Sequence, residues 1–292
     1  MRKGLNRAGR RGAKNSLCNV FDVGAVPLTA AAVETVDLSR RFGKLVAVDR
    51  ISFGVQTGSV FGLLGPNGAG KSCTIKMLTT LLPPTGGSAR VAGYDVVREP
   101  HEVRRRIGYV PQMPSTDGDL TGRENLKVMA ELYSVPRSEE RRRIDESLRL
   151  MELSSAADTL VKNYSGGMIR RLEIAQSMLH EPAILFLDEP TIGLDPAARA
   201  VVWDHVRALR AKFNVTIFLT THYMEEAEEL CDCVAFLHRG SVARIGAPAD
   251  LRAAVGANAT LDDVFIALAE DTQEGGDFAD ALRARRAAQY LE

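Results

Sequence analysis

The segment Gly65–Ser72, GPNGAGKS, has the residue types and spacing that bind nucleotide phosphates. It matches the pattern Gly-x-x-x-x-Gly-Lys-Ser/Thr at every fixed position. Glycines let backbone N–H groups converge on phosphate oxygens, and a helix that begins after the loop adds positive potential. Lys71 supplies a charge to the β- and γ-phosphates, and Ser72 offers a hydroxyl ligand to Mg²⁺. The predicted nucleotide contacts are Gly65, Pro66, Asn67, Gly68, Ala69, Gly70, Lys71, Ser72 and Cys73.

An apolar run that ends in two acids, ILFLDEP at Ile184–Pro190, predicts a buried strand with carboxylates at its end. Asp188 is placed to hold the Mg²⁺ shell, generally through water, and Glu189 to accept a proton from an attacking water. General-base assistance of this kind contributes about 10²–10⁴ in rate. Alone, such a string is more often an ordinary strand-to-loop junction. Its position downstream of a phosphate loop favours the acidic metal site.

Two further polar residues follow predicted strands. Gln112 closes the strand IGYVPQ, and His222 follows the strand VTIFLT. A neutral imidazole at this position can donate to a γ-phosphate and orient water. Taken without further context, Gln112 is equally a polar residue at a strand end, and a lone histidine after a strand is usually structural.

The elements that must position these residues are those of an α/β protein. A strand over Val60–Leu64 leads into the Gly-rich loop, and a helix opens near Lys71. From about 114 to 179 the pattern is helical, with Pro136 separating GRENLKVMAELYSV from SEERRRIDESLRLMEL. Strands and helices alternate after that. The sequence therefore predicts a parallel-rich α/β core that carries a helical insertion.

Composition limits the classes of function that the chain can have. The 292 residues are 45% hydrophobic, which is enough for a sizeable core, and the net charge of zero gives no global field that favours nucleic acid. No apolar segment approaches the roughly 18–20 residues of a membrane helix, so we expect any membrane attachment to come through a partner. The four cysteines show no framework spacing, which predicts a reduced cytosolic setting.

The first 14 residues are basic and contain no acid. They include no apolar h-region, so a secretory signal is not expected. A disordered tail, or a start codon placed too far upstream, is the interpretation we favour. The alternative is a basic arm that contacts anionic lipid, where each such residue contributes about 1 kcal/mol.

The segment YSGGM at Tyr164–Met168 distinguishes this chain from other nucleotide binders. Ser165 is placed to N-cap the helix that follows, which leaves free N–H groups at Gly166 and Gly167. In order along the chain, GPNGAGKS, YSGGM, ILFLDEP, GLDP and TTHYMEEAE resemble the nucleotide-binding subunits of ATP-binding-cassette (ABC) transporters. The resemblance covers about residues 33–270.

The resemblance implies a P-loop NTPase (ABC ATPase) core with an antiparallel β subdomain and an inserted α-helical subdomain. It implies ATP and Mg²⁺ as cofactors, catalytic roles for Lys71, Glu189, His222 and Gln112, and Mg²⁺ contacts from Ser72, Gln112 and Asp188. It also places an adenine-stacking aromatic at Phe42, for which a core aromatic is the alternative. The expected contacts to ATP held by a second subunit are Ser165, Gly166, Gly167 and Asp195.

The same resemblance predicts the domain boundaries. We expect a basic, disordered extension over 1–30 and an ABC ATPase domain over 33–247, with its helical insertion at about 114–179. A C-terminal helical extension is expected over 248–292.

Several segments favour one subgroup within the family. YSGGM in place of LSGGQ, the segment LTGRENL at Leu120–Leu126 and the closing TLDDVF resemble exporters of the daunorubicin type (ABC-2-type exporters), whose ATPase and membrane subunits are separate chains. The expected partners are a multi-span membrane permease and a second copy of this chain or a related ATPase, with no nucleic acid. The expected location is the cytoplasmic face of the membrane, as a peripheral subunit.

Two other functions are compatible with the sequence. One is a non-transport ABC protein that acts on ribosomes or DNA, which usually carries two cassettes or a long coiled coil; this chain shows one cassette and no heptad run. The other is an importer ATPase. Sugar-importer types add a regulatory β-domain, for which the residues after His222 leave little room.

The clusters of arginine are interpreted as solvated helix faces without a functional role. They lie at Arg104–Arg106, Arg141–Arg143 and Arg170–Arg171, with acidic residues such as Glu102 and Glu173 close by in the sequence. Such spacing is typical of exposed helices that carry i,i+4 ion pairs.

Overall fold

The computed structural model describes residues 31–270. The predictions for the basic extension over 1–30 and for the chain end after 270 lie outside the described residues. Within the described part, no helix is long and apolar enough to cross a membrane.

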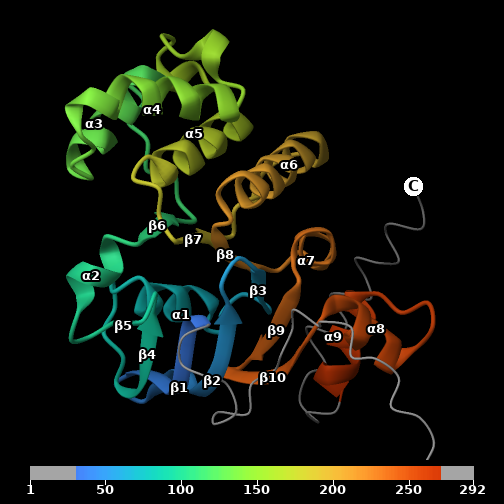
Figure 1. Ribbon diagram of the computed structural model, residues 1–292. Coiled ribbons are helices and arrows are strands. Elements are labelled where there is room, and N and C mark those ends of the chain that lie inside the picture. The colour runs from blue at the N-terminus through green and yellow to red at the C-terminus, as the bar shows by residue number, and fades with distance from the viewer. Residues whose placement is uncertain (1–30, 271–292) are drawn as a thin grey trace, which may run out of the picture.

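A six-stranded sheet forms the centre of the molecule, in the order β10-β9-β3-β8-β7-β6 (Figure 1). Its strands are β3 (Val60–Leu64), β6 (Ile107–Val110), β7 (Ile184–Asp188), β8 (Thr216–Thr221), β9 (Cys233–His238) and β10 (Ser241–Gly246). All neighbours pair in parallel except β9 and β10. Because parallel strands end at one common edge, the segments that follow β3, β6, β7 and β8 are brought together there. These segments carry the phosphate loop, Gln112, the acid pair and His222.

A second sheet is antiparallel and has the order β2-β1-β4-β5. Its strands are β1 (Ala31–Phe42), β2 (Leu45–Gln56), β4 (Gly86–Val91) and β5 (Tyr94–Asp95). The apolar and β-branched pattern predicts the first two strands. It does not predict β4, GGSARV, since two glycines and exposed polar residues hide the alternation, nor the two-residue β5.

The helices divide between the two parts of the chain. Around the core lie α1 (Lys71–Leu78), α2 (Pro100–Arg104), α6 (Pro196–Phe213), α7 (Met224–Leu230), α8 (Pro248–Val255) and α9 (Leu261–Glu270). Between β6 and β7 the chain forms α3 (Gly122–Leu132), α4 (Arg137–Leu150) and α5 (Gly166–Met178), with short 3₁₀ turns at Ser154–Ala156 and Val161–Asn163. Figure 1 shows α3, α4 and α5 together at the end of the molecule opposite the antiparallel sheet. We call these three helices the helical insertion.

Local signals explain where the insertion begins. Thr121 caps α3 by accepting a hydrogen bond from the Glu124 backbone N–H, and the Glu124 side chain accepts one from Thr121 in return. This capping box satisfies N–H groups that a helix start leaves unpaired. Pro136 precedes α4, where its missing N–H costs nothing.

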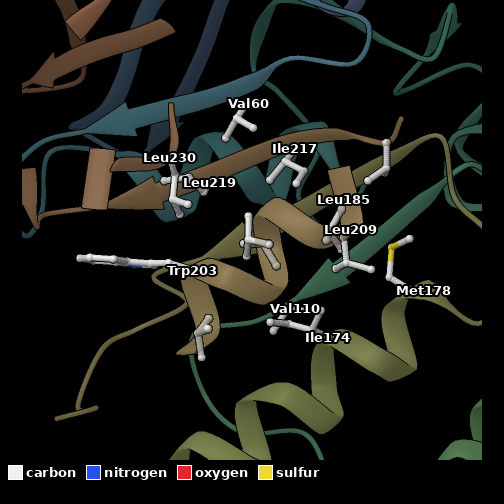
Figure 2. Close-up of a cluster of buried hydrophobic side chains, with 14 of the residues drawn as sticks. Val60, Val110, Ile174, Met178, Leu185, Trp203, Leu209, Ile217, Leu219 and Leu230 are labelled. Atoms are coloured by element: carbon white, nitrogen blue, oxygen red, sulfur yellow. The ribbon is translucent and has the colours of Figure 1, made fainter. Parts of the chain in front are cut away.

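Two hydrophobic clusters hold the elements together. The first lies between the central sheet and helices α5, α6 and α7. Figure 2 shows side chains from these helices facing those of the strands, among them Val60, Val110, Ile174, Met178, Leu185, Trp203, Leu209, Ile217, Leu219 and Leu230. The second cluster joins the two sheets through a row of aromatic rings: Phe53, Phe61, Phe218 and Phe186, with consecutive centroids 5.2–5.4 Å apart.

Candidate active site

The phosphate loop takes a backbone path that requires glycine. β3 ends at Leu64 and α1 begins at Lys71, so the loop joins a buried strand to a helix N-terminus. Gly65 and Gly70 have φ values of +157° and +107°, and a Cβ on either would lie only 2.3 or 2.5 Å from a backbone oxygen. Neither position accepts a side chain without a shift of the backbone. Gly70 leaves the start of α1 without a side-chain cap, which suits an external acceptor such as phosphate.

Lys71 makes three short contacts in its buried position. Its Nζ donates to the carbonyl oxygens of Gly65, at 2.7 Å, and Pro66, at 3.1 Å. The same nitrogen lies 3.0 Å from Oε1 of Glu189, and the two side chains are 5% and 4% exposed. The predicted phosphate-binding cation and the predicted general base therefore form a buried ion pair.

Glu189 is held in an unusual backbone conformation. Its φ of +51° lies in the left-handed region, which non-glycine residues rarely adopt. The Glu189 N–H donates to the backbone oxygen of Thr220, at 3.1 Å, and to its hydroxyl, at 3.0 Å. The other carboxylate oxygen, Oε2, lies 2.6 Å from Nδ1 of His222. These contacts fix the carboxylate between Lys71 and His222.

The surroundings of Glu189 favour its charged form. Burial acts to raise its pKa, but the hydrogen bond from His222 and the charge of Lys71 outweigh burial and lower the pKa below the ordinary value. Glu189 is therefore ionised at neutral pH. A carboxylate is the form that a general base needs.

Asp188 lies in a different environment one residue away. Its Oδ1 accepts a hydrogen bond of 2.6 Å from the Thr220 hydroxyl and lies 3.4 Å from the Ser72 hydroxyl. Burial raises the pKa of Asp188, and the neighbouring charge of Glu189 adds to that increase. A carboxylate and a hydroxyl aimed at one point are hard oxygen ligands, which suit Mg²⁺ when phosphates and water complete its shell. The residues therefore fit the metal that the sequence predicts.

The remaining predicted contacts to describe are Gln112, Cys73 and Phe42. Gln112 is exposed, two residues past the end of β6, and its backbone oxygen accepts a hydrogen bond from Arg170. Cys73 is a partly buried free thiol in the first turn of α1. Phe42 ends β1 with 44% of its surface exposed, and the Arg40 guanidinium lies 4.5 Å from its ring centre. Phe42 is thus not a core aromatic, whereas adenine stacking stays a prediction.

The predicted in-trans contacts form a second group. Ser165 caps α5, and its hydroxyl accepts a 3.3 Å hydrogen bond from the Met168 N–H, as expected for a helix that begins at Gly166. A Cβ on Gly167 would lie 3.2 Å from Ala198 in the first turn of α6. Asp195 caps α6 by accepting a hydrogen bond of 2.8 Å from Ala198. The YSGGM segment and the GLDP loop therefore lie side by side.

Sequence reasoning missed two residues that support the site. The Thr220 hydroxyl contacts both Asp188 and Glu189, and nothing local in the sequence shows that its strand lies next to ILFLD. Glu226 is fully buried in α7 and accepts hydrogen bonds from Thr191, at 2.8 Å, and Trp203, at 3.0 Å. Burial raises the pKa of Glu226. In the sequence it is one of several acids in MEEAEEL, and no local pattern identifies it.

One expectation about the arginine clusters was wrong. Arg170 and Glu173 are 5% and 3% exposed, so they do not lie on a solvated helix face. They pair at i,i+3, with 3.1 Å between Nη1 and Oε2. The spacing of charged residues in the sequence did not show that α5 is covered by α3, α4, α6 and the loop after β6.

The fold and the site together define a phosphate-loop nucleotide-binding protein. Comparisons with known proteins give its family. A family model described as "ABC transporter" matches residues 48–192. The daunorubicin/doxorubicin resistance ATP-binding protein DrrA of Streptomyces peucetius is 48% identical over 227 residues, which are 78% of this chain and 68% of that protein.

Two further comparisons agree with that match. The Nod factor export ATP-binding protein I of Ralstonia nicotianae is 40% identical over 229 residues, which are 78% of this chain and 70% of that protein. A solved structure of an ATP-binding subunit of an ABC transporter is 33% identical, with a TM-score of 0.72 and coverage of 81% of this chain and 99% of the other.

The chain belongs to the family of ABC transporter ATP-binding subunits. It is an ABC-type ATPase, homologous to the ATPases of drug-resistance and Nod factor exporters. The resemblance and the fold class predicted from the sequence are confirmed.

Proposed function

We propose that this chain couples MgATP-driven pairing and hydrolysis to the efflux of a drug-like or hydrophobic compound through a separate membrane subunit. The observation that carries the catalytic part is the meeting of Lys71, Asp188, Glu189 and His222 at one edge of the central sheet. The direction of transport and the kind of cargo are inferred from the resistance and export proteins to which the chain is similar.

The buried ion pair suggests how nucleotide binding prepares the site. The β- and γ-phosphates attract Lys71 more strongly than one carboxylate does, so ATP releases Glu189 from its contact with Nζ. Glu189 then stays oriented by His222 and by the two bonds from its N–H to Thr220, and it accepts the proton of the attacking water. His222 donates to the γ-phosphate or orients that water. Gln112 reaches the same water or the metal from the end of β6.

Ser72, Asp188 and Gln112 are the residues that would hold Mg²⁺. Bound there, Mg²⁺ supplies charge neutralisation between the β- and γ-phosphates. Phe42 offers one face of its ring to adenine while Arg40 covers the other.

The separation of the two groups of predicted contacts favours a pair of ATPase subunits. Ser165, Gly166, Gly167 and Asp195 lie together beside α6, and none of them makes a hydrogen bond to the phosphate loop within the part of the chain described. We propose that these residues cap ATP held by a second copy of this chain or by a related ATPase. The free N–H groups at the start of α5 supply the contact to the γ-phosphate.

Exposed apolar side chains on the loop after β6 and on α3 suggest where a membrane partner docks. Met113 is 75% exposed directly after Gln112, and Val128 and Leu132 on α3 are 46% and 71% exposed. We propose that a multi-span permease docks over these residues, which places the chain at the cytoplasmic face of the membrane as a peripheral subunit. We also propose 33–247 as the ATPase domain, with its helical insertion at about 114–179 and a C-terminal helical extension from 248.

The experiment is to tag this chain in its native host, extract membranes in detergent and identify what co-purifies. A stoichiometric multi-span protein without a substrate-binding protein supports an exporter. A binding protein in the complex supports an importer instead, and ribosomal or DNA-bound partners contradict the transport assignment.

The proposed role of Glu189 as general base is tested separately with the Glu189→Gln variant. We expect phosphate release to fall by about 10²–10⁴, the usual contribution of a general base, while ATP binding persists. Unchanged turnover would show that Glu189 is not the base.

A further inference from the structure

Tyr223, the residue directly after His222, lies against the imidazole ring of that histidine. The two ring centres are 4.1 Å apart, and the ring planes meet at 37°. The Tyr223 N–H donates to the Thr221 hydroxyl at the end of β8, at 3.0 Å, which fixes the backbone of the tyrosine to the central sheet. Rings at this separation attract each other. The His222 ring therefore packs against Tyr223 while its Nδ1 contacts Glu189.

Arg199, in the first turn of α6, packs on the Tyr223 ring. Its guanidinium carbon lies 4.3 Å from the ring centre, a distance at which a cation and an aromatic face attract each other. The Arg199 backbone N–H donates to the carbonyl oxygen of Asp195, so the arginine is anchored to the start of the helix. A series of contacts thus runs from α6 through Tyr223 to His222.

Polar contacts do not explain the position of Arg199. The side chain is 16% exposed, yet its Nε is buried and has no hydrogen-bond partner in the part of the chain that the structure describes. A buried donor without an acceptor costs free energy. The carboxylate of Glu225 is 3.8 Å away and 70% exposed, and such an ion pair contributes little. The contact with the Tyr223 ring is the interaction that distinguishes this arrangement.

The orientation of the His222 ring matters because of the bond it makes to Glu189. Glu189 is ionised, and a carboxylate only accepts hydrogen bonds, so the proton of this bond lies on Nδ1 of His222. A bond of 2.6 Å tolerates little rotation of the imidazole ring. When ATP draws Lys71 away, His222 is the side chain that stays in contact with the Glu189 carboxylate among the described residues.

We propose that Tyr223 and Arg199 are positioning residues that hold the His222 ring in the orientation in which its Nδ1 restrains Glu189. Tyr223 acts on the imidazole ring directly, and Arg199 acts by holding the Tyr223 ring. Neither residue touches the reacting atoms in this role. This inference rests on the proposed function, since it takes Glu189 as the general base.

The first test is an NMR measurement on the full chain without nucleotide, with ¹⁵N in the histidine rings. The His222 signals are assigned by their absence in His222→Gln. We expect a downfield Nδ1–H proton signal from His222 in the wild type, because a short bond to a carboxylate holds that proton. The signal should broaden or disappear in Tyr223→Leu, where the imidazole ring turns more freely. An unchanged His222 signal in Tyr223→Leu would overturn the inference.

The second test is ATP turnover at limiting and saturating MgATP. Tyr223→Leu should lower kcat by roughly 2- to 13-fold, which is the strength of one aromatic pair expressed as an equilibrium factor, and leave KM unchanged. Arg199→Met should lower kcat by a smaller factor, because the Tyr223 ring remains. Tyr223→Phe keeps the ring without its hydroxyl and should retain most of the wild-type kcat and the His222 signal. A loss in Tyr223→Phe equal to that in Tyr223→Leu would contradict a role for the ring contact.

A double-mutant cycle shows whether Tyr223 acts through His222. In a His222→Gln background, Tyr223→Leu should cause no further loss of kcat, because the imidazole ring that it positions is gone. A further loss as large as in the wild type would overturn the inference. Unchanged turnover in Glu189→Gln would instead contradict the proposed function, and the His222 signal would still show whether Tyr223 holds the ring.

Tyr133→Leu is the matched control. Tyr133, directly after α3, is stacked on the His180 ring, with 3.8 Å between the ring centres and 19° between the planes. The variant removes the same kind of pair at a place outside the site. It should lower Tm and alter the His180 signals while the His222 signal and kcat stay as in the wild type. A loss of kcat in Tyr133→Leu equal to that in Tyr223→Leu would mean that general damage is responsible, and would overturn the inference.

Discussion

Lys71, the predicted phosphate-binding cation, contacts Glu189, the predicted general base. Each side chain is nearly buried, and each satisfies the charge of the other at 3.0 Å. A buried carboxylate and a buried ammonium are both costly when alone. Each of these residues is therefore expected to affect stability as well as the proposed catalysis, and the two effects must be measured separately.

Lys71→Met should weaken both nucleotide affinity and stability. Loss of one partner of a buried pair costs about 3–5 kcal/mol, against a total stability of roughly 5–15 kcal/mol, so the variant should stay folded with a lower Tm. Adding Glu189→Gln should recover part of that Tm but none of the affinity. ATP titration and thermal melting of both single variants and the double variant check this; purely additive effects on Tm would contradict the pair.

The ionisation of Glu189 predicts a pH dependence of stability. Its folded pKa is lowered, so its stabilising effect is present above the unfolded value of about 4.3 and is lost as pH falls through the folded pKa. The free energy of unfolding of the wild type, relative to Glu189→Gln, should therefore be constant near neutral pH and decline in acid. Urea unfolding at several pH values measures the difference, and a rise on acidification would refute it.

At the scale of elements, two caps in the helical insertion have the same chemistry and different expected roles. Ser165 caps α5, and Thr121 caps α3, each by accepting a backbone N–H three residues later. Only the first faces the loop that carries Asp195. A cap stabilises its own helix, and any further role of the capping residue depends on the residues that face it.

Ser165→Ala and Thr121→Ala should each cost about 0.5–2 kcal/mol, because each leaves one helix N–H without its acceptor. Only Ser165→Ala should also weaken ATP-dependent dimerisation in a Glu189→Gln background. Thermal melting and size-exclusion chromatography with and without MgATP check the pair. The same loss of dimerisation in both variants would mean that general damage to the insertion, and not the Ser165 contact, is responsible.

The elements also show what the sequence could predict. The run ILFLD and the segment Val60–Leu64 appear as strands with the predicted ends, because fully apolar runs bounded by glycine or acid have few other structures. The motif residues meet because parallel strands share an edge. Thr220, Glu226 and the buried state of Arg170 were not predictable, since each depends on contacts between segments far apart in the chain.

At the scale of the whole molecule, Met113 and Leu132 are two of the exposed apolar residues and belong to the proposed docking surface. A combined Met113→Glu and Leu132→Glu variant should retain ATP binding but recover much less membrane partner than the wild type, because charge opposes burial at an interface. Val255→Glu at the end of α8, also exposed, is the control and should recover as much partner as the wild type. Equal recovery in both would contradict the docking surface.

The row of phenylalanine rings has a mechanical consequence. Phe53 belongs to the antiparallel sheet, and Phe61, Phe218 and Phe186 belong to three strands of the central one, so the two sheets resist displacement as a single block. The helical insertion is joined to that block by two stretches of backbone, 111–121 and 179–183, and by the packing of α5 against β6 and α6. Gln112 lies on the first of these two stretches. A ligand that binds Gln112 would therefore act directly on a covalent link between the insertion and the two sheets.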